Sequence, residues 1–311
     1  MDTFAIAAIR PPRPRIILYR SPRLLPLKRI DHISMAAPDW KTQCEKLERL
    51  LGFRFAHSWE AHPGEDFAGS VSDVRGTGIQ FEVIEPAGPG SFVQRFLDER
   101  GPGLHHITVE VHDIEAAAAE LERLGIRPFG GITDDGLWRI TYIHPRDSGG
   151  ILWQLFVPKK PDAQPPVEVG GGVVELQRLD HVSMAVEDLD RQVAWQAQVF
   201  GMEVQGRWRE DSLGYEGCVM TIPGSLLKFE MMQPTRPDSF VQKFIDERRS
   251  GMHHICCEVA SVERAATALR AEGIEPFGGV IESDWKKHTF LHPRDSGGVL
   301  FQLFEEPVRR D

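Results

Sequence analysis

The stretch GLHHITVEV at residues 103–111 returns as GMHHICCEV at residues 251–259, so the chain carries one strand-like segment twice. Segments on either side return in the same order. RIDHISMAAPDW at 29–40 has a near-copy at 178–189, and HPRDSGG at 144–150 is identical at 292–298. Equivalent residues lie 149 positions apart before Phe67 and 148 positions apart from Phe67 onward. The chain is therefore a tandem duplication, which predicts two domains of one fold.

The segment between the copies, VPKKPDAQPPVEVGGG at 157–172, has the Pro, Gly and charge content of a domain linker. We therefore predict one domain at 28–158, a linker at 159–175 and a second domain at 176–307. The first 27 residues are rich in Arg and Pro and lack the order of a secretory signal. They are predicted to form an N-terminal tail on the surface.

Each half repeats once more, and the repeated unit is a strand, a helix and three further strands. In the second unit, HHITVEV leads into DIEAAAAELERLGI, where apolar residues recur at helical spacing and a Gly follows. Several strands follow each helix, which differs from a doubly wound pattern. The expected fold class is α+β, with four βαβββ modules paired into two domains whose curved mixed sheets form clefts.

Composition and charge exclude several classes of protein. A hydrophobic content of 41% and a charged content of 26% are typical of a soluble globular protein. A net charge of −10 argues against nucleic-acid binding, and no apolar run is long enough to cross a membrane. Four cysteines without a CxxC pair are no disulfide framework, so we expect a reducing, cytoplasmic location.

Polar residues recur at two places in every unit. The first strand carries a histidine, and the last strand carries an acid or an amide within an apolar run. In chain order these residues are His32, Glu82, His106, Gln154, His181, Glu230, His254 and Gln302. A lone polar residue in a strand is usually a satisfied core residue, but a buried carboxylate needs a compensating partner. Four residues in register per half predict a divalent metal site, with Zn, Co, Ni, Mn or Fe as the ion.

At these residues the chain resembles the vicinal oxygen chelate superfamily of glyoxalases, bleomycin-resistance proteins and dioxygenases, and within it the methylmalonyl-CoA epimerases. The matching stretches are DHISMAAPD, SFVQRFLDERGPGLHHITVEVHDI and HPRDSGGILWQLF, with their second copies. The resemblance implies two glyoxalase-like domains that form an internal pseudo-dimer, or a homodimer of the chain. It also implies that the two quartets are metal ligands, with His106 and His254 as the ligating members of the His-His pairs. Strand alternation then turns His105 and His253 to the other side.

The chain departs from the family pattern at two places. The family usually carries Gln on the fourth strand of a domain and Glu on the last, and here Glu82 and Glu230 precede Gln154 and Gln302. The family's other base is a Glu on the second strand, and the corresponding positions in this chain are occupied by Ser70 and Cys218. Glu82 and Glu230 are therefore the predicted catalytic bases. The weaker candidates are His105, His253, Glu65 and Cys218.

The resulting prediction is a metal-dependent isomerase or epimerase with one site per half. It would abstract a proton α to the carbonyl of a small oxygenated substrate through a metal-stabilised enolate. Two alternatives stay open. One is a non-haem iron ring-cleaving or 2-oxoacid dioxygenase, which uses two His and one carboxylate. The other is a non-catalytic binding or resistance protein.

The HPRDSGG loops allow two interpretations. Asp-Ser-Gly-Gly predicts a hairpin turn. A second interpretation places Arg146 and Arg294 at the mouth of each cleft, where they would bind an anionic group of the substrate. Trp138 and Trp285 lie just upstream and are candidates for the cleft wall, although single aromatic residues more often serve packing.

Overall fold

We describe a computed structural model of the chain. The structure describes residues 25, 27–61, 66–134, 136–160, 170–222, 224–282 and 286–306. These residues form two eight-stranded mixed sheets with seven α-helices, an α+β fold in which neither sheet closes into a barrel. The expected fold class is confirmed. Of the predicted tail and linker, residues 1–24, 26 and 161–169 lie outside the described residues.

The two halves contain the same elements in the same order. The first half consists of β1 (Leu27–Ala36), α1 (Trp40–Leu51), β2 (Arg54–Trp59), β3 (Phe67–Asp73), β4 (Gln80–Pro86), α2 (Phe92–Arg100), β5 (Gly103–Val111), α3 (Ile114–Arg123), β6 (Phe129–Asp134), β7 (Trp138–Ile143), the short 3-10 helix η1 (Pro145–Asp147) and β8 (Leu152–Pro158). The second half consists of β9 (Leu176–Ala185), α4 (Leu189–Phe200), β10 (Glu203–Glu210), β11 (Tyr215–Thr221), β12 (Lys228–Pro234), α5 (Phe240–Arg248), β13 (Gly251–Val259), α6 (Val262–Ala271), β14 (Phe277–Glu282), β15 (Lys287–Leu291), α7 (Pro293–Ser296) and β16 (Leu300–Glu305).

In each sheet the two βαβββ modules meet edge to edge. The strand order is β2-β3-β4-β1-β5-β8-β7-β6 in the first half and β10-β11-β12-β9-β13-β16-β15-β14 in the second. The central pairs, β1 with β5 and β9 with β13, are antiparallel, and each central strand is parallel to the last strand of its own module. The first and last strands of each module, which carry the predicted ligands, therefore lie together at the centre of each sheet.

The repeated DHxSMA…D segment explains the start of each half. After β1 ends at Ala36, the side chain of Asp39 caps α1. It accepts a hydrogen bond from the backbone N–H of Thr42 at 2.9 Å. Asp188 caps α4 in the same way. Gly52 and Gly201 end these helices with φ of 73° and 66°, which a glycine adopts without strain.

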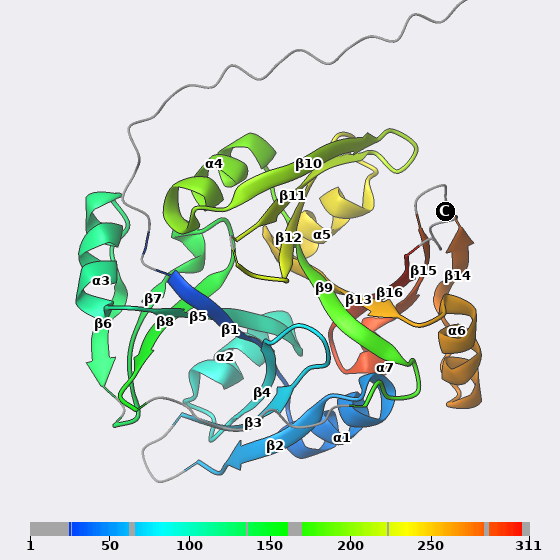
Figure 1. Ribbon diagram of the computed structural model, residues 1–311, viewed down its shortest axis with the longest axis horizontal. Coiled ribbons are helices and arrows are strands. Elements are labelled where there is room, and N and C mark those ends of the chain that lie inside the picture. The colour runs from blue at the N-terminus through cyan, green and yellow to red at the C-terminus, as the bar shows by residue number, and fades with distance from the viewer. Residues whose placement is uncertain are drawn as a thin grey trace, which may run out of the picture.

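One hydrophobic core runs through both halves. The ring of Trp153 on β8 lies 4.4 Å from that of Phe200 on α4 and 5.7 Å from that of Phe229 on β12, between centroids. Phe301 on β16 contacts Phe53 and Phe81 of the first half. Figure 1 shows the matching arrangement, with α1 beside α7 and with α3 and α6 at opposite ends of the molecule. The halves thus pack as an internal pair, and the number of copies in solution stays a prediction.

The HPRDSGG loops are part of this packing. The predicted hairpin turn is confirmed, because each loop joins two consecutive antiparallel strands, β7 to β8 and β15 to β16. The loops contain a 3-10 turn at residues 145–147 and a single helical turn at residues 293–296. Gln43 of α1 donates to the carbonyl of Ser296 at 2.7 Å, and Gln192 of α4 donates to that of Ser148 at 3.0 Å. A Cβ atom at Gly150 would lie 2.0 Å from a carbonyl oxygen of the other half. The Gly-Gly pair therefore lets the halves approach closely.

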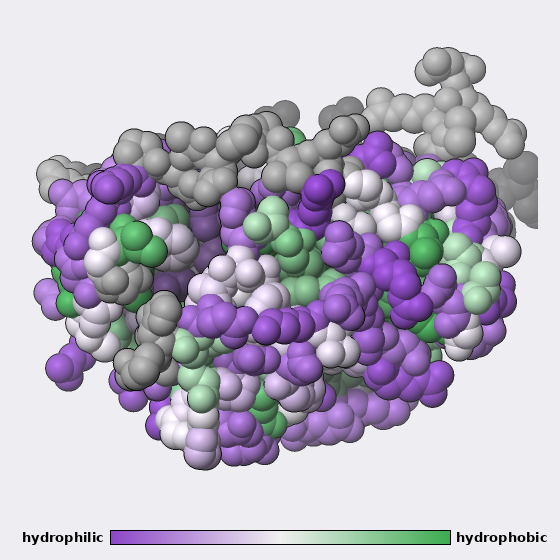
Figure 2. Space-filling model, turned by 90° about the horizontal axis from the view of Figure 1, so that it is seen from below, coloured by the Kyte–Doolittle hydropathy of each residue, from purple (hydrophilic) through white to green (hydrophobic). Residues whose placement is uncertain are grey.

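Figure 2 shows a mainly hydrophilic face on which hydrophobic residues form small separate groups. Within the described residues, no helix is long and apolar enough to cross a membrane.

Candidate metal centre

β-bulges in the central strands set the direction of the site side chains. In the pairing of β1 with β5, Ile30 opposes Val109 and His32 opposes Thr108, so Asp31 is an extra residue. Asp180 is the extra residue at the same place in β9. Bulges redirect side chains and are frequent beside functional sites. Here they bring an aspartate and the histidine after it to the same side of the strand.

The predicted ligands occupy two neighbouring rows across each sheet. In the first half, one row runs from His32 through Thr108 to Gln154, and the next runs from Glu82 through Ser34 to His106. Residues opposite each other on paired strands lie on one face of the sheet. The four predicted ligands therefore surround a shared point. The second half repeats both rows, from His181 through Cys256 to Gln302 and from Glu230 through Ser183 to His254.

The donor atoms converge within each half. Glu82 Oε2 lies 3.6 Å from His32 Nε2 and 3.5 Å from His106 Nε2. The ligand atoms of this trio all lie within 4.8 Å of one another, as do those of His181, Glu230 and His254. Two donors bound to one metal at about 2.0–2.2 Å stand roughly 3.0–3.5 Å apart. The trios have close to the spacing that a metal requires.

Several of these atoms are buried without a hydrogen-bond partner among the described residues. They are Glu82 Oε2, His181 Nε2 and His254 Nε2. Unsatisfied buried polar atoms of this kind are costly, and a metal ion would satisfy them. The residues present therefore fit a divalent cation of the kind that binds two imidazoles and a carboxylate.

An aspartate holds the first histidine of each trio. His32 Nδ1 lies 2.8 Å from Asp31 Oδ2, and His181 Nδ1 lies 2.8 Å from Asp180 Oδ1. A carboxylate on Nδ1 fixes the ring and leaves Nε2 as the ligating atom. Burial lowers the pKa of His32, but Glu82 and Asp31 overcome this effect and raise it. Burial also lowers the pKa of His181, whereas Cys256, Asp180 and Glu230 raise it to about 10.

The second histidine of each trio is held by its neighbour. Nδ1 of His106 lies 2.8 Å from Nδ1 of His105, and the same contact joins His254 and His253. Burial lowers the pKa of His105 to about 4 and that of His106 well below its usual value. Both rings are therefore neutral at neutral pH, and His106 can offer Nε2 to a metal.

The prediction that His105 faces away from His106 is wrong. Ser34 opposes His106 and Met35 opposes Leu104, so His105 is the extra residue of another bulge. Its ring lines the cleft and lies 4.8 Å from that of Phe96, between centroids. His253 is the corresponding extra residue in β13. Strict alternation fails because a bulge interrupts the pleat.

The first-half trio opens into a cleft of about 1750 Å³. His32, Glu82, His106 and Gln154 all line it. Trp138 also lines it, stacked on Phe156 with 4.6 Å between centroids. The second predicted wall residue, Trp285, lies outside the described residues. At an offset of 148, the counterpart of Trp138 is Lys286, whose Nζ lies 3.4 Å from Gln302 Oε1.

The other predicted site residues lie elsewhere. Arg146 and Arg294 are 72% and 71% exposed in their side chains, and each contacts the aspartate that follows it. Arg146 does not line the first-half cleft, although the adjacent Pro145 does. Ser70 opposes Val83 rather than Glu82, so it faces away from the trio. Cys218 lies in the hydrophobic core, where burial raises the pKa of its thiol. Glu65 is outside the described residues.

Three kinds of site residue escaped the sequence-based prediction. Asp31 and Asp180 precede the first histidine of each half, and the repeated Asp-His pair was the available signal. Thr108 and Cys256 lie two residues after the ligating histidines, which places them on the same strand face. Tyr142 OH accepts a hydrogen bond from Gln154 Nε2 at 3.3 Å, and only the strand pairing identifies it.

Comparison with known proteins found a family match and several named relatives. Residues 31–142 and 180–291 match the family described as Glyoxalase/Bleomycin resistance protein/Dioxygenase superfamily. The chain is 32% identical over 144 residues to human mitochondrial methylmalonyl-CoA epimerase, covering 45% of the chain and 81% of the relative. It is 32% identical over 130 residues to ethylmalonyl-CoA/methylmalonyl-CoA epimerase of Cereibacter sphaeroides, covering 40% and 96%.

A solved structure has the same fold over nearly the whole chain. It is a mutant 4-hydroxymandelate synthase from Streptomyces coelicolor, with a TM-score of 0.69 and 16% identity, covering 92% of this chain and 95% of that one. At this identity the likeness concerns the fold alone.

Proposed function

Because the chain belongs to the glyoxalase/bleomycin resistance/dioxygenase superfamily, we propose that it is a divalent-metal-dependent isomerase or epimerase with one site per half. Its substrate would be a small carbonyl compound, and acyl-CoA thioesters are the first class to test because two relatives are named as epimerases of such thioesters. The observation that carries the proposal is the buried trio of two histidines and a glutamate, repeated in both halves.

The chain's own residues would hold the metal and leave part of its coordination shell open. His32 and His106 would hold the metal through Nε2, with Asp31 and His105 fixing their rings. Glu82 and Gln154 would complete the protein ligands, and the remaining positions would be open to substrate. When bound, the metal would supply Lewis-acid polarisation of the substrate carbonyl.

Glu82 is the proposed base of the first half, and Glu230 that of the second. The two residues are 7% and 9% exposed, and Glu82 lines the cleft. A base must lie within hydrogen-bond reach of the proton that it removes, either directly or once it leaves the metal.

The cleft is large for a small metabolite. About 1750 Å³ exceeds the roughly 300–1000 Å³ of ordinary small-molecule pockets. Arg75 and Arg95 line it and could bind a phosphorylated or carboxylated ligand, whereas Lys28 and Arg29 on its wall already pair with Glu110. Carboxylates such as Asp66 and Asp73 line it as well. The size of the cleft and these two arginines suit an acyl thioester carried on a large anionic group.

A second candidate, an iron-dependent dioxygenase, is favoured by the trio itself. Two histidines and one carboxylate with open positions form the ligand set of non-haem iron oxygenases. The two proposals share the two histidines and the glutamate and differ in the co-reactant, because only the dioxygenase consumes O₂.

The test combines metal analysis with two assays. We expect purified protein to contain close to two divalent ions per chain, and the double variant H106A/H254A to contain none. H112A is the matched control, since His112 is an exposed histidine outside the trio. Incubation of methylmalonyl-CoA or another acyl-CoA in D₂O without oxygen should then introduce deuterium at the α-carbon.

The results separate the proposals. Protein without bound metal that also fails to bind added metal would refute both enzymatic proposals and favour a binding protein. Bound iron with oxygen-dependent turnover and no exchange would favour the dioxygenase. Exchange that H106A/H254A abolishes and H112A retains would support the isomerase.

A further inference from the structure

The two sites differ at the residue between the predicted ligands. In the first half, Thr108 lies between His32 on β1 and Gln154 on β8, and in the second half Cys256 takes this place. A hydroxyl is a weak metal ligand, whereas a thiolate is a strong one that favours softer ions. Any role of Cys256 here rests on the proposed function, because it concerns the metal of the same site.

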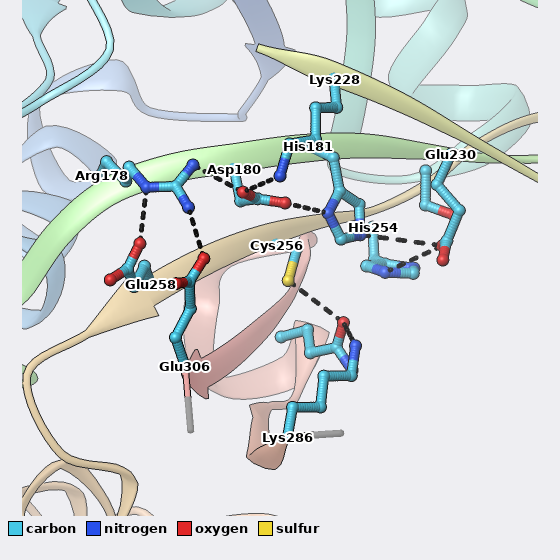
Figure 3. A network of polar contacts seen from close by, with 12 residues as sticks. Arg178, Asp180, His181, Lys228, Glu230, His254, Cys256, Glu258, Lys286 and Glu306 are labelled. Carbon is cyan, nitrogen blue, oxygen red and sulfur yellow. Dashed lines mark hydrogen bonds and ion pairs between the residues drawn. The ribbon is translucent and has the colours of Figure 1, made fainter. Parts of the chain in front are cut away.

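Cys256 is enclosed by predicted ligands. It opposes His181 on β9 and Gln302 on β16, so its side chain lies on the face that carries them. The residue is fully buried, and its Sγ lies 3.2 Å from Gln302 Oε1. Figure 3 shows the sulfur on the same side of the sheet as His181 and His254.

The first half shows how far a side chain at this place reaches. Thr108 Oγ1 lies 2.9 Å from His32 Nε2 and 2.8 Å from Gln154 Oε1. Because His32 Nε2 is a predicted ligand atom, the position of Thr108 borders directly on the metal site. The Cys256 sulfur occupies the equivalent place beside His181.

The second site also has more unsatisfied atoms. Among the described residues, His181 Nε2 and His254 Nε2 are both buried without a hydrogen-bond partner. These residues are 7% and 6% exposed. Thus two imidazole nitrogens are aimed into the site. The buried thiol lies on the same face but outside the group of donor atoms that stand within 4.8 Å of one another, so an ion would draw it inward.

We propose that Cys256 Sγ takes the place of Gln302 as a metal ligand in the second half, together with His181, Glu230 and His254. When the sulfur–metal bond forms, the S–H bond breaks and the proton leaves to solvent. Two imidazoles, one carboxylate and one thiolate make a four-ligand set that prefers zinc or cobalt to manganese. The first half has only nitrogen and oxygen donors, so one chain holds two metal sites of different preference.

The test uses the full-length chain loaded with Co²⁺, because thiolate bound to cobalt gives a charge-transfer absorption in the near ultraviolet. Wild-type protein is expected to bind two ions and to show this band. C256T copies the first half, and it should keep two ions, lose the band and lose zinc affinity at the second site by more than about 10-fold. T108C in the C256T background should restore the band in the first half.

C257A is the matched control, because Cys257 is equally buried but packs in the hydrophobic core. It should leave the band unchanged. Wild-type protein that binds two Co²⁺ ions without the band would overturn the role of Cys256 and leave the metal-site proposal intact. A band that survives in C256T would also overturn it. Protein that binds no Co²⁺ at all would overturn both proposals, so the two failures are distinguishable even if C256T does not fold.

Discussion

The two halves keep the same ligands and differ in what surrounds them. Both have an Asp-His pair on the first strand, a Glu on the fourth and a His-His pair on the fifth. Around these ligands, Thr108 corresponds to Cys256, Tyr142 to Phe290 and Trp138 to Lys286, at an offset of 148. The duplication thus preserves the donors that a metal would need, while the residues around these donors differ.

This difference indicates that the halves are not interchangeable. Gln154 contacts a hydroxyl on each side, from Thr108 and from Tyr142, whereas Gln302 contacts a thiol and an ammonium group. The amide therefore has only neutral partners in the first half, whereas one of its partners in the second half is a cation. Four experiments, each with a partner change in the other half, test how far the halves differ.

Removal of a ligating histidine should have the largest effect. H106A should empty the first half and H254A the second, each with a loss of metal affinity of more than about 100-fold, because the trio loses one of its three donors. Metal content per chain should fall from two to one in each single variant. Equal loss of both ions in either variant would show instead that the sites bind cooperatively.

Substitution of the aspartate behind the histidine should have the next largest effect. D31N and D180N should each lower metal affinity by about 10–100-fold in their own half, because Asn no longer fixes the ring as a carboxylate does. Asp180 also accepts from Lys228 at 2.8 Å and Arg178 at 2.5 Å, so we expect D180N to cost more stability. Titration with Zn²⁺ and thermal unfolding check this. D246N, at an exposed residue of α5, should change neither quantity.

Changes at the contact between halves should lower stability without affecting the ligands. The new Cβ atom would lie 2.0 Å from a backbone carbonyl oxygen of the other half in G150A, and 2.4 Å from such an oxygen in G298A. The positive φ values of 106° and 123° add strain for alanine. We expect a loss of roughly 2 kcal/mol in the free energy of unfolding for each. Denaturant unfolding measures it, and G206A, which meets no atom within 4 Å, is the control.

The smallest effect on stability is expected at the exposed arginines. R146A and R294A should change the free energy of unfolding by no more than about 0.5 kcal/mol, because the side chains are exposed and their ion pairs are local. The KM for an anionic substrate tests the role predicted from the sequence. A clear rise in R146A would place Arg146 at the substrate, whereas an unchanged KM would remove it from the site.

Prediction from the sequence was most complete for features that recur in every repeat. The periodicity and the turn residues sufficed for four βαβββ modules, since the hydrophobic pattern of each unit matches its strands and helix. The ligand quartets were predicted because a polar residue recurs at the same place in four apolar strands. The contacts of Asp31 and His105 with the ligating histidines were not predicted. Each of these two residues lies in a bulge, which breaks the strand alternation on which the prediction depended.

The sequence by itself therefore determined the duplication, the α+β modules and the residues that can hold a metal, because these depend on local pattern and on the order of elements. Only the tertiary structure decided what lies next to what. Strand pairing placed Thr108 and Cys256 between the ligands, and the contact between halves assigned the HPRDSGG loops to packing. These are contacts between residues far apart in the chain, and no local pattern of side chains encodes them.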